Sequence, residues 1–264
     1  MNAWERLVSA WPGYERRPQQ ELMAEYVTAA INDGTHLVVE AGTGIGKSLA
    51  YLIPAMLHAS EHGDTVVVAT RTIALQEQVL RDIPLLKHAL GLDGLPVAIA
   101  KGRGNYVCRR RAEAALENGP GQFRDEADWR DLNNIVGWAE ESEDGSLSSL
   151  GFKPSDAAWD AAKAESGNCL DSACKFFQQC GYQQSKRRLA KARIVVANHT
   201  LVAIDLSVRA ARKPAEDDGE DGAAPRGILP PHCALVLDEA HEFAEAVRSV
   251  EEEAIGAWAV QRAI

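Results

Sequence analysis

The segment AGTGIGKS, residues 41–48, constrains the fold of this chain more than any other feature. It directly follows the apolar run HLVVE (36–40), and an apolar stretch with helical character begins at Ser48. A glycine-rich turn between a strand and a helix lies at the carboxyl end of the strand, in a sheet whose strands run parallel. The segment therefore predicts an α/β fold.

Further apolar runs rich in valine, alanine and isoleucine occur between helical stretches. These runs are TVVVA (65–69), PVAIA (96–100), RIVVAN (193–198) and ALVLD (234–238). Short runs that are apolar throughout are typical of strands buried on both faces, and strands that alternate with helices form parallel sheets. We therefore expect a parallel sheet covered by helices on both faces.

The glycine-rich segment also has the composition of a phosphate-binding loop. Its glycines let the backbone approach an anion, which then lies at the positive end of the following helix. Lys47 would reach the β and γ phosphates of a nucleoside triphosphate, and Ser48 would bind Mg²⁺. The candidate nucleotide-binding residues are Ala41, Gly42, Thr43, Gly44, Ile45, Gly46, Lys47 and Ser48, with alanine where such loops usually begin with glycine. The alternative is a glycine-rich turn that binds no ligand.

A pair of acidic residues follows the last apolar run. LVLDEAH (235–241) places Asp238 at the carboxyl end of a strand, the edge where open α/β sheets bind ligands. Asp238 would hold Mg²⁺, and Glu239 would orient and deprotonate the attacking water in triphosphate hydrolysis. Taken alone, such a pair is more often a helix N-cap. With a phosphate loop in the same chain, we assign it to catalysis.

The net charge of -10 opposes binding to nucleic acid, but the charge is unevenly distributed. The segment 215–227 has five acidic residues and one arginine, so one loop supplies about half of the excess. No run approaches the roughly 18 apolar residues of a membrane helix. Glu5 and Arg6 interrupt the N-terminal segment in which a signal peptide would need an apolar run. We therefore expect a cytoplasmic protein.

Residues 101–190 separate the third and fourth of the five expected strands, too long a connection for a simple loop. We expect a small domain here. Its cysteines are Cys108, Cys169, Cys174 and Cys180. In a reducing compartment they suggest metal or redox chemistry, and their spacing alone leaves zinc and an iron–sulfur cluster both open. Cys233 lies apart from them, beside the last expected strand, and is expected to be a core thiol.

Two basic segments flank these cysteines. Their cations are Lys101, Arg103, Arg109, Arg110, Arg111, Lys186, Arg187, Arg188, Lys191 and Arg193. If the two segments fold together, they form one basic patch suited to a single-stranded nucleic acid backbone. Tyr106, Phe176, Phe177 and Tyr182 are available to stack on bases, although aromatic residues are more often part of a core. The alternative for any one arginine is a solvated helix face.

Several motifs resemble those of superfamily 2 helicases. A-x-T-G-x-G-K-S with DEAH is similar to the two nucleotide motifs of that superfamily, in which alanine at the first loop position is common. YERRPQQELM (14–23) resembles the Q motif, which implies that Gln20 reads adenine with Arg17 beside it. VVVATRTIALQEQVL (66–80) resembles motif Ia, and His241 would couple the nucleotide site to DNA. The four cysteines, KGRGNYVC and VVANHTL resemble the XPD-like iron–sulfur helicases, most closely their DinG/YoaA branch.

This resemblance implies a RecA-like fold, with ATP and Mg²⁺ bound at the glycine-rich loop and a [4Fe-4S] cluster held by the four cysteines. It implies an ATP-dependent DNA helicase that translocates 5′ to 3′ on single-stranded or forked DNA and serves repair or replication. Residues 1–100 would begin the first motor domain, 101–190 would be the iron–sulfur insert, and 191–264 would complete the domain, with an acidic loop at 214–227 and the start of an arch. A second RecA-like domain, with its arginine finger, is expected outside these 264 residues.

Two other functions are compatible with the same motifs. Without a second motor domain, the chain would be a DNA- and ATP-binding module with little turnover or unwinding. The second is a redox-sensing regulator that uses the same fold. A nuclease is disfavoured, because the sequence contains no set of carboxylates typical of an exonuclease.

Overall fold

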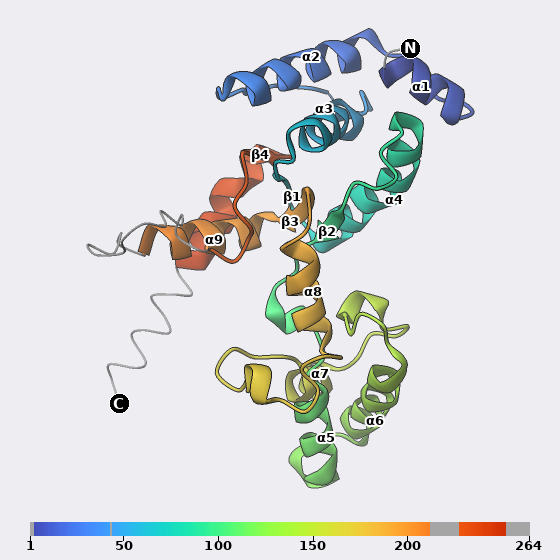
Figure 1. The fold of residues 1–264 in the computed structure, drawn as a ribbon. Helices are drawn as coiled ribbons and strands as arrows, with labels where there is room; N and C mark the ends of the chain where they lie inside the picture. Colours follow the sequence, from blue (N-terminus) through green and yellow to red (C-terminus); the bar gives the residue numbers. More distant parts are fainter. Residues whose placement is uncertain (1–2, 43, 212–226, 252–264) are drawn as a thin grey trace. The chain divides into compact units, whose positions relative to one another are not determined.

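The computed structural model describes residues 3–42, 44–211 and 227–251. The chain divides into two compact units (Figure 1). The sheet unit comprises residues 1–100 and 189–264, and the cysteine unit comprises Lys101–Arg188. The acidic loop expected at 214–227 lies outside the described residues except for Gly227. Of the expected start of an arch, residues 243–251 are described, and they are helical.

The sheet unit contains four parallel strands in the order β2-β3-β1-β4. They are β1 (Val66–Thr70), β2 (Val97–Ile99), β3 (Ile194–Asn198) and β4 (Ala234–Leu237). Each coincides with one of the expected apolar runs. Val66 pairs with both Ile194 and Ala234, so β3 and β4 flank β1 in the same register. The predicted parallel α/β sheet is confirmed.

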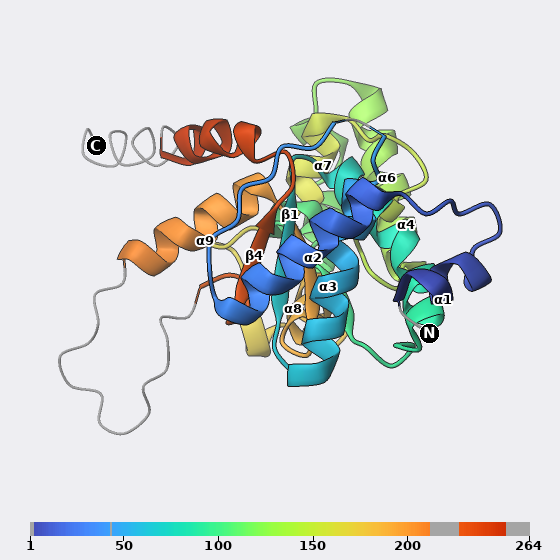
Figure 2. The same cartoon turned by 90° about the horizontal axis from the view of Figure 1, so that it is seen from above.

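Helices cover both faces of this sheet, as predicted, and Figure 2 shows the same elements from above. They are α1 (Ala3–Ala10), α2 (Pro18–Asp33), α3 (Lys47–His62), α4 (Ile73–Leu90) and α9 (His199–Ala211). Because side chains alternate along a strand, Val66 and Val68 of β1 enter the core beneath α1 to α4, whereas Val67 and Ala69 enter the core beneath α9. The strand is buried on both sides, which explains why its first four positions are all apolar.

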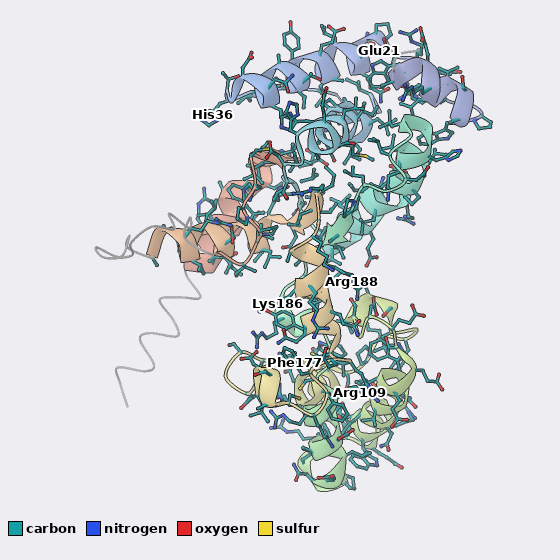
Figure 3. All side chains as sticks on the ribbon, in the orientation of Figure 1. Glu21, His36, Arg109, Phe177, Lys186 and Arg188 are labelled. Carbon is teal, nitrogen blue, oxygen red and sulfur yellow. The ribbon has the colours of Figure 1, made fainter. Side chains whose placement is uncertain are left out.

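The prediction of a strand at 36–40 is wrong. The segment has no regular secondary structure, and residue Val38 is 97% exposed. His36, at its start, projects away from the end of α2 (Figure 3). A strand is defined by its ladder of backbone hydrogen bonds, and no described strand pairs with this segment. Apolar composition alone could not reveal that the pairing partner is missing.

The cysteine unit is mainly helical. Its helices are α5 (Arg109–Glu117), α6 (Glu126–Glu141), α7 (Asp156–Ala162) and α8 (Gly181–Leu189), joined by the short 3-10 turns η1 (Arg103–Asn105), η2 (Pro120–Gln122), η3 (Leu147–Ser149) and η4 (Asp171–Ala173). Leu132, Ile135 and Trp159 lie in its own core. The Trp159 indole donates a hydrogen bond to the Gly104 carbonyl at 2.9 Å, which satisfies its polar edge. Within the described ranges of the whole chain, no helix has the length and apolar character needed to cross a membrane.

Candidate nucleotide site and cysteine pocket

The glycine-rich loop lies at the amino end of α3. Gly44 and Gly46 both have φ of 81°, a backbone conformation that L side chains rarely adopt. Gly46 caps α3, whose first residue is Lys47 and whose second is Ser48. The unpaired amide groups of this helix end favour an anion beside it. Thr43, one of the predicted contacts, lies outside the described residues.

The two predicted Q-motif residues lie against this loop. Gln20 is buried, and its amide nitrogen donates to the Gly46 carbonyl at 2.8 Å, while its amide oxygen accepts from the Tyr14 hydroxyl at 2.5 Å. Arg17 donates to the Gly44 carbonyl. Both side chains therefore hold the loop backbone, and Tyr14 is a supporting residue that the sequence did not single out. To bind adenine, the Gln20 amide would have to give up its hydrogen bond with Tyr14 or with the Gly46 carbonyl.

The catalytic lysine and carboxylate that the motifs predicted are in contact. Lys47 Nζ lies 2.7 Å from Glu239 Oε1. Hydrogen bonding between them raises the pKa of Lys47 and lowers the pKa of Glu239. Glu239 adopts a left-handed backbone conformation with φ of 53°, uncommon for a residue with a side chain. The sharp turn directs its carboxylate back toward α3 immediately after β4.

Asp238 directly follows β4, as the sequence predicted, and its side chain is partly buried. Burial, followed by repulsion from Glu239, raises the pKa of its carboxyl group. The Tyr51 hydroxyl lies 3.3 Å from Asp238 Oδ2, and His199 Nε2 lies 2.9 Å from the Asp238 carbonyl oxygen. Burial raises the pKa of Tyr51 and lowers that of His199, which favours the neutral form of each.

Tyr51 and His199 both contact Asp238, and the motifs assigned neither of them a role there. Tyr51 lies one turn into α3, among apolar residues that give no sign of a polar contact. His199 belongs to the quoted VVANHTL segment, yet its role depends on β3 and β4 ending at the same edge of the sheet. These contacts join residues far apart in the chain, so no local pattern predicts them.

His241 is the most exposed of the predicted catalytic residues, with 71% of its side chain accessible. Its Nδ1 lies 3.6 Å from Glu239 Oε2, and its Nε2 lies 3.6 Å from Glu242 Oε1. Glu242 also pairs with Arg71 at 3.2 Å, and Arg71 follows β1 directly. A chain of polar contacts therefore runs from Glu239 through His241 and Glu242 to the segment that resembles motif Ia.

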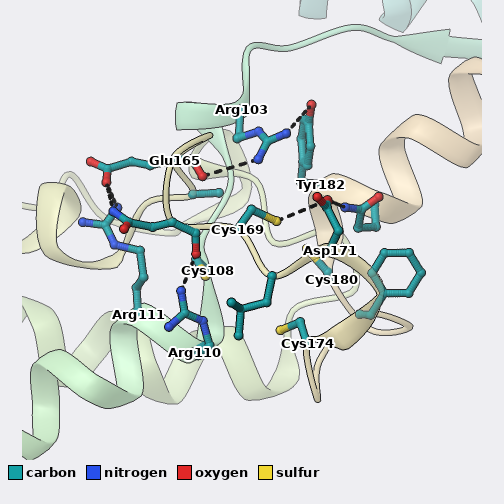
Figure 4. A pocket seen from close by; sticks show the side chains of 15 residues that line it. Arg103, Cys108, Arg110, Arg111, Glu165, Cys169, Asp171, Cys174, Cys180 and Tyr182 are labelled. Carbon is teal, nitrogen blue, oxygen red and sulfur yellow. Dashed lines mark hydrogen bonds and ion pairs between the residues drawn. The ribbon is translucent and has the colours of Figure 1, made fainter.

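The four cysteines of the cysteine unit line one hollow (Figure 4). Cys108 precedes α5, Cys169 and Cys174 flank η4, and Cys180 precedes α8. All four are free thiols. Burial raises the pKa of Cys108, and nearby Cys180 and Cys174 add to this shift. The fold thus gathers four sulfur donors from positions up to seventy-two residues apart, the largest separation being that of Cys108 and Cys180.

Arginines hold the irregular segment that carries Cys169. Arg110 donates to the Asn168 carbonyl, and Arg111 donates to the Lys163 carbonyl at 2.6 Å and pairs with Glu165 at 2.9 Å. These cations line the same hollow as the sulfurs. The charge of Arg110 partly offsets the burial that raises the pKa of Cys108.

Cys233 does not join this group, and its prediction as a core thiol is wrong. It is exposed, one residue before β4, where the chain enters the sheet from the surface. Its amide donates to the Thr65 carbonyl at 3.0 Å. The prediction failed because a residue can adjoin a buried strand and still lie outside the core.

Cations lie over half-buried aromatic rings in the cysteine unit, where Figure 3 labels Arg109, Phe177 and Lys186. Arg103 and Lys186 both approach the Tyr182 ring, at 4.4 and 6.0 Å from its centre. Arg109 lies 5.1 Å from the Phe176 ring centre, and Arg187 lies 5.4 Å from that of Phe177. The shared Tyr182 ring brings the two predicted basic segments together within this unit. Tyr106, by contrast, is buried and donates to Ser185 Oγ at 2.8 Å, so it belongs to the core.

The parallel sheet with helices on both faces is consistent with a RecA-like α/β domain, and its glycine-rich loop lies at the start of a helix. Residues 17–104 match the DEAD/DEAH box helicase family. This stretch therefore matches a DEAD/DEAH helicase domain, and the resemblance of the motifs to superfamily 2 helicases is confirmed.

Relatives with similar sequences are named as helicases. The chain is 37% identical over 260 residues to the ATP-dependent helicase DinG of Mycobacterium tuberculosis (strain ATCC 25177 / H37Ra), covering 92% of this chain and 36% of that protein. It is 35% identical over 243 residues to the ATP-dependent DNA helicase YoaA of Escherichia coli (strain K12), covering 90% and 35%. The ATP-dependent DNA helicase DinG of Salmonella choleraesuis (strain SC-B67) is 31% identical over 253 residues, covering 90% and 33%. The chain is homologous to these helicases and spans about a third of their length.

Proposed function

We propose that this chain forms part of an ATP-dependent DNA helicase, with the nucleotide site at the carboxyl edge of the sheet. One observation carries the proposal: the amino end of α3 and the end of β4 bring Lys47 and Glu239 into contact, with Asp238 beside them. These are the groups that phosphoryl transfer to water requires, namely a cation for the phosphates and carboxylates for the metal and the water. The relatives named as ATP-dependent helicases support the same function.

Each residue has a distinct role in this proposal. The loop from Ala41 to Ser48 binds the phosphates through its backbone amides, and Lys47 exchanges Glu239 for the β and γ phosphates. Ser48 and Asp238 supply a hydroxyl and a carboxylate, oxygen donors that suit Mg²⁺, which would neutralise phosphate charge when bound. Glu239, once released by Lys47, accepts the proton of the attacking water. His241 transmits the state of the site through Glu242 to Arg71.

The four cysteines are proposed to hold a [4Fe-4S] cluster. They supply four sulfur donors around one hollow, which arginines also line. In the described residues, no three of these sulfurs belong to a group of ligand atoms within 4.8 Å of one another. A single zinc ion, with bonds of about 2.3 Å, would require sulfurs about 3.8 Å apart. In a [4Fe-4S] cluster each cysteine binds a different iron, so the four sulfurs lie farther from one another than around a single ion. A cluster therefore suits the spacing of these sulfurs better than zinc does.

Single-stranded or forked DNA is the proposed partner. The cation-covered rings of Tyr182, Phe176 and Phe177 combine charge for phosphates with surfaces for bases. We further propose translocation from 5′ to 3′, a role in DNA repair or replication, a cytoplasmic location and cooperation with a second RecA-like domain. These details follow from the resemblance to XPD-like helicases.

DNA-stimulated ATP hydrolysis tests the nucleotide proposal. The wild-type chain should bind a fluorescent ATP analogue, and Lys47→Ala should abolish both binding and any turnover. Lys87→Ala, in the last turn of α4, is the matched control and should change neither. Failure of the wild type to bind the analogue would overturn the proposal. Binding without DNA-stimulated turnover would favour the binding module instead.

Anaerobic purification tests the cluster separately. About four irons and four sulfides per chain are expected for a [4Fe-4S] cluster. Cys174→Ser should lose them, whereas Cys233→Ser should retain them. A colourless protein that contains zinc would overturn the cluster. A cluster whose oxidation changes DNA affinity would favour the redox-sensing function.

A further inference from the structure

A second group of potential metal ligands lies in the sheet unit, away from both sites described above. His58, Asp64 and Cys233 each offer one ligand atom, and the three atoms lie within 4.8 Å of one another. His58 is in the last turns of α3, Asp64 precedes β1, and Cys233 precedes β4. In the described part of the chain, no other three histidine, cysteine or acidic side chains converge so closely.

The backbone fixes the positions of these three residues. Val66 of β1 pairs with Ala234 of β4, so the residues just before the two strands lie at the same edge of the sheet. The Cys233 amide donates to the Thr65 carbonyl at 3.0 Å, which extends the pairing beyond the strands. Helix α3 starts at Lys47, beside the nucleotide site, and ends at His62. The group therefore lies at the opposite end of α3 from the phosphate loop.

The spacing suits a tetrahedral ion. His58 Nε2 lies 3.6 Å from Asp64 Oδ2. An ion with bonds of about 2.05 Å to nitrogen and oxygen in tetrahedral geometry separates those two atoms by about 3.3 Å. A shift of a few tenths of an ångström would close the difference. Asp64 can make that adjustment, because about half of its side chain is exposed.

The histidine ring is already oriented for such a bond. His58 Nδ1 lies 3.1 Å from Asn32 Oδ1, at the end of α2. A side-chain amide oxygen only accepts hydrogen bonds, so Nδ1 donates to Asn32, and Nε2 is the ring nitrogen that faces Asp64. A hydrogen bond to the remote ring nitrogen is the usual support of a metal-binding histidine. The His58 side chain is only 12% exposed, which limits its freedom to turn away.

We propose that His58, Asp64 and Cys233 bind a divalent transition-metal ion of the Zn²⁺ type, with water at the fourth position. Imidazole and thiolate ligands select such an ion over Mg²⁺ or Ca²⁺, which prefer oxygen. The bound ion ties the end of α3 to the starts of β1 and β4. It acts as a structural clamp at the edge of the sheet opposite the proposed nucleotide site.

Alkylation of Cys233 tests the site, because peptide mapping by mass spectrometry follows this thiol apart from the four cysteines of the other unit. Added Zn²⁺ should slow iodoacetamide alkylation of Cys233 in the wild-type chain at least tenfold, and a chelator should restore the rate. His58→Gln and Asp64→Asn should remove most of the protection. An unchanged Cys233 rate with Zn²⁺ would overturn the site.

The matched control is His88→Gln. His88 also faces an aspartate, Asp93, at 4.0 Å, but in the described residues no third ligand joins that pair. This variant should retain full zinc protection of Cys233. Equal loss of protection in His88→Gln and His58→Gln would mean that zinc binds elsewhere, and the proposal would fail. Circular dichroism of each variant verifies that the fold is intact before the rates are compared.

Discussion

Lys47 Nζ lies 2.7 Å from Glu239 Oε1, and the two residues are 192 positions apart in the chain. The contact joins the first residue of α3 to the turn after β4. In this arrangement the cation proposed for the phosphates and the carboxylate proposed for the water neutralise each other. Under the proposed function, ATP must separate this pair before Lys47 can bind the phosphates and Glu239 can accept the proton of the water.

Glu239→Gln should separate binding from hydrolysis. The substitution leaves Lys47 with a neutral partner, so ATP no longer has to break an ion pair. Because both side chains are partly exposed, the pair contributes at most about 1 kcal/mol, and the ATP Kd should fall by no more than about fivefold. Turnover should fall by at least about a hundredfold, since the proton acceptor is lost. Fluorescent nucleotide binding and phosphate release measure the two effects, and weaker ATP binding in this variant would contradict the argument.

Gly46→Ala should destabilise the chain more than an alanine at another left-handed glycine. A Cβ at Gly46 would lie 2.2 Å from Gln20 Nε2, in addition to the strain of its positive φ. Gly63 has φ of 74° with no atom within 4 Å of the added Cβ, so Gly63→Ala carries the backbone cost alone. We expect about 3 kcal/mol for Gly46→Ala and about 1 kcal/mol for Gly63→Ala. Urea unfolding measures both values.

A double substitution can isolate the contribution of the clash between the added Cβ at Gly46 and the Gln20 side chain. In the background of Gln20→Ala, the further cost of Gly46→Ala should fall to about that of Gly63→Ala, about 1 kcal/mol. A cost that stays at the original value would show that Gln20 is not the obstacle.

Asp238→Asn should stabilise the ligand-free chain while removing its response to Mg²⁺ and ATP. Burial and Glu239 raise the pKa of Asp238 above its usual 3.8. As pH rises above 3.8, the unfolded chain releases this proton first, so stability falls until pH passes the raised folded pKa. Asparagine carries no charge, so it avoids the free-energy cost of burying a carboxylate, and its side-chain oxygen can still accept a hydrogen bond from the Tyr51 hydroxyl. A rise of roughly 1–3 °C in Tm near neutral pH is expected, with no further rise on adding Mg²⁺ and ATP.

Acid should destabilise the sheet unit through His199. Burial lowers the pKa of this histidine below 6.5 in the folded chain. Below pH 6.5 the unfolded chain therefore binds the proton more readily, and stability falls until pH reaches the lowered folded pKa. The loss of Tm between about pH 7.5 and about pH 5.5 should be smaller in His199→Gln than in the wild type.

Tyr182→Ala should weaken binding of single-stranded DNA. Loss of a stacking ring costs about 1–3 kcal/mol, or about fivefold to a hundredfold in Kd. Tyr182→Phe retains the ring and should bind within about twofold of the wild type. Fluorescence anisotropy with a labelled oligonucleotide measures these affinities, and equal Kd values for the wild type and Tyr182→Ala would rule out stacking on this ring.

Arg187→Gln should reduce the salt dependence of the same binding. One lost phosphate contact lowers the slope of log K against log salt by about 0.7 for a single strand. Arg124→Gln, on an exposed turn outside the basic segments, should leave the slope unchanged. A similar loss in both variants would indicate only a general effect of net charge.

The sequence by itself determined the local features. Apolar runs predicted β1 to β4, and glycines that require left-handed φ marked the loop before α3. These predictions succeed because strand burial and backbone freedom depend on the residue and its close neighbours. The same reasoning failed at 36–40, where an apolar run has no described partner strand, and at Cys233, which adjoins a strand but is exposed.

Only the tertiary structure decided which distant residues meet. The Lys47–Glu239 pair, the placement of Gln20 on the Gly46 carbonyl and the group of His58, Asp64 and Cys233 all join separate elements. A parallel sheet brings the ends of strands to a common edge whatever their distance along the chain. The strand order and register that create these contacts are set by the packing of the whole sheet, and no local pattern of residues contains them.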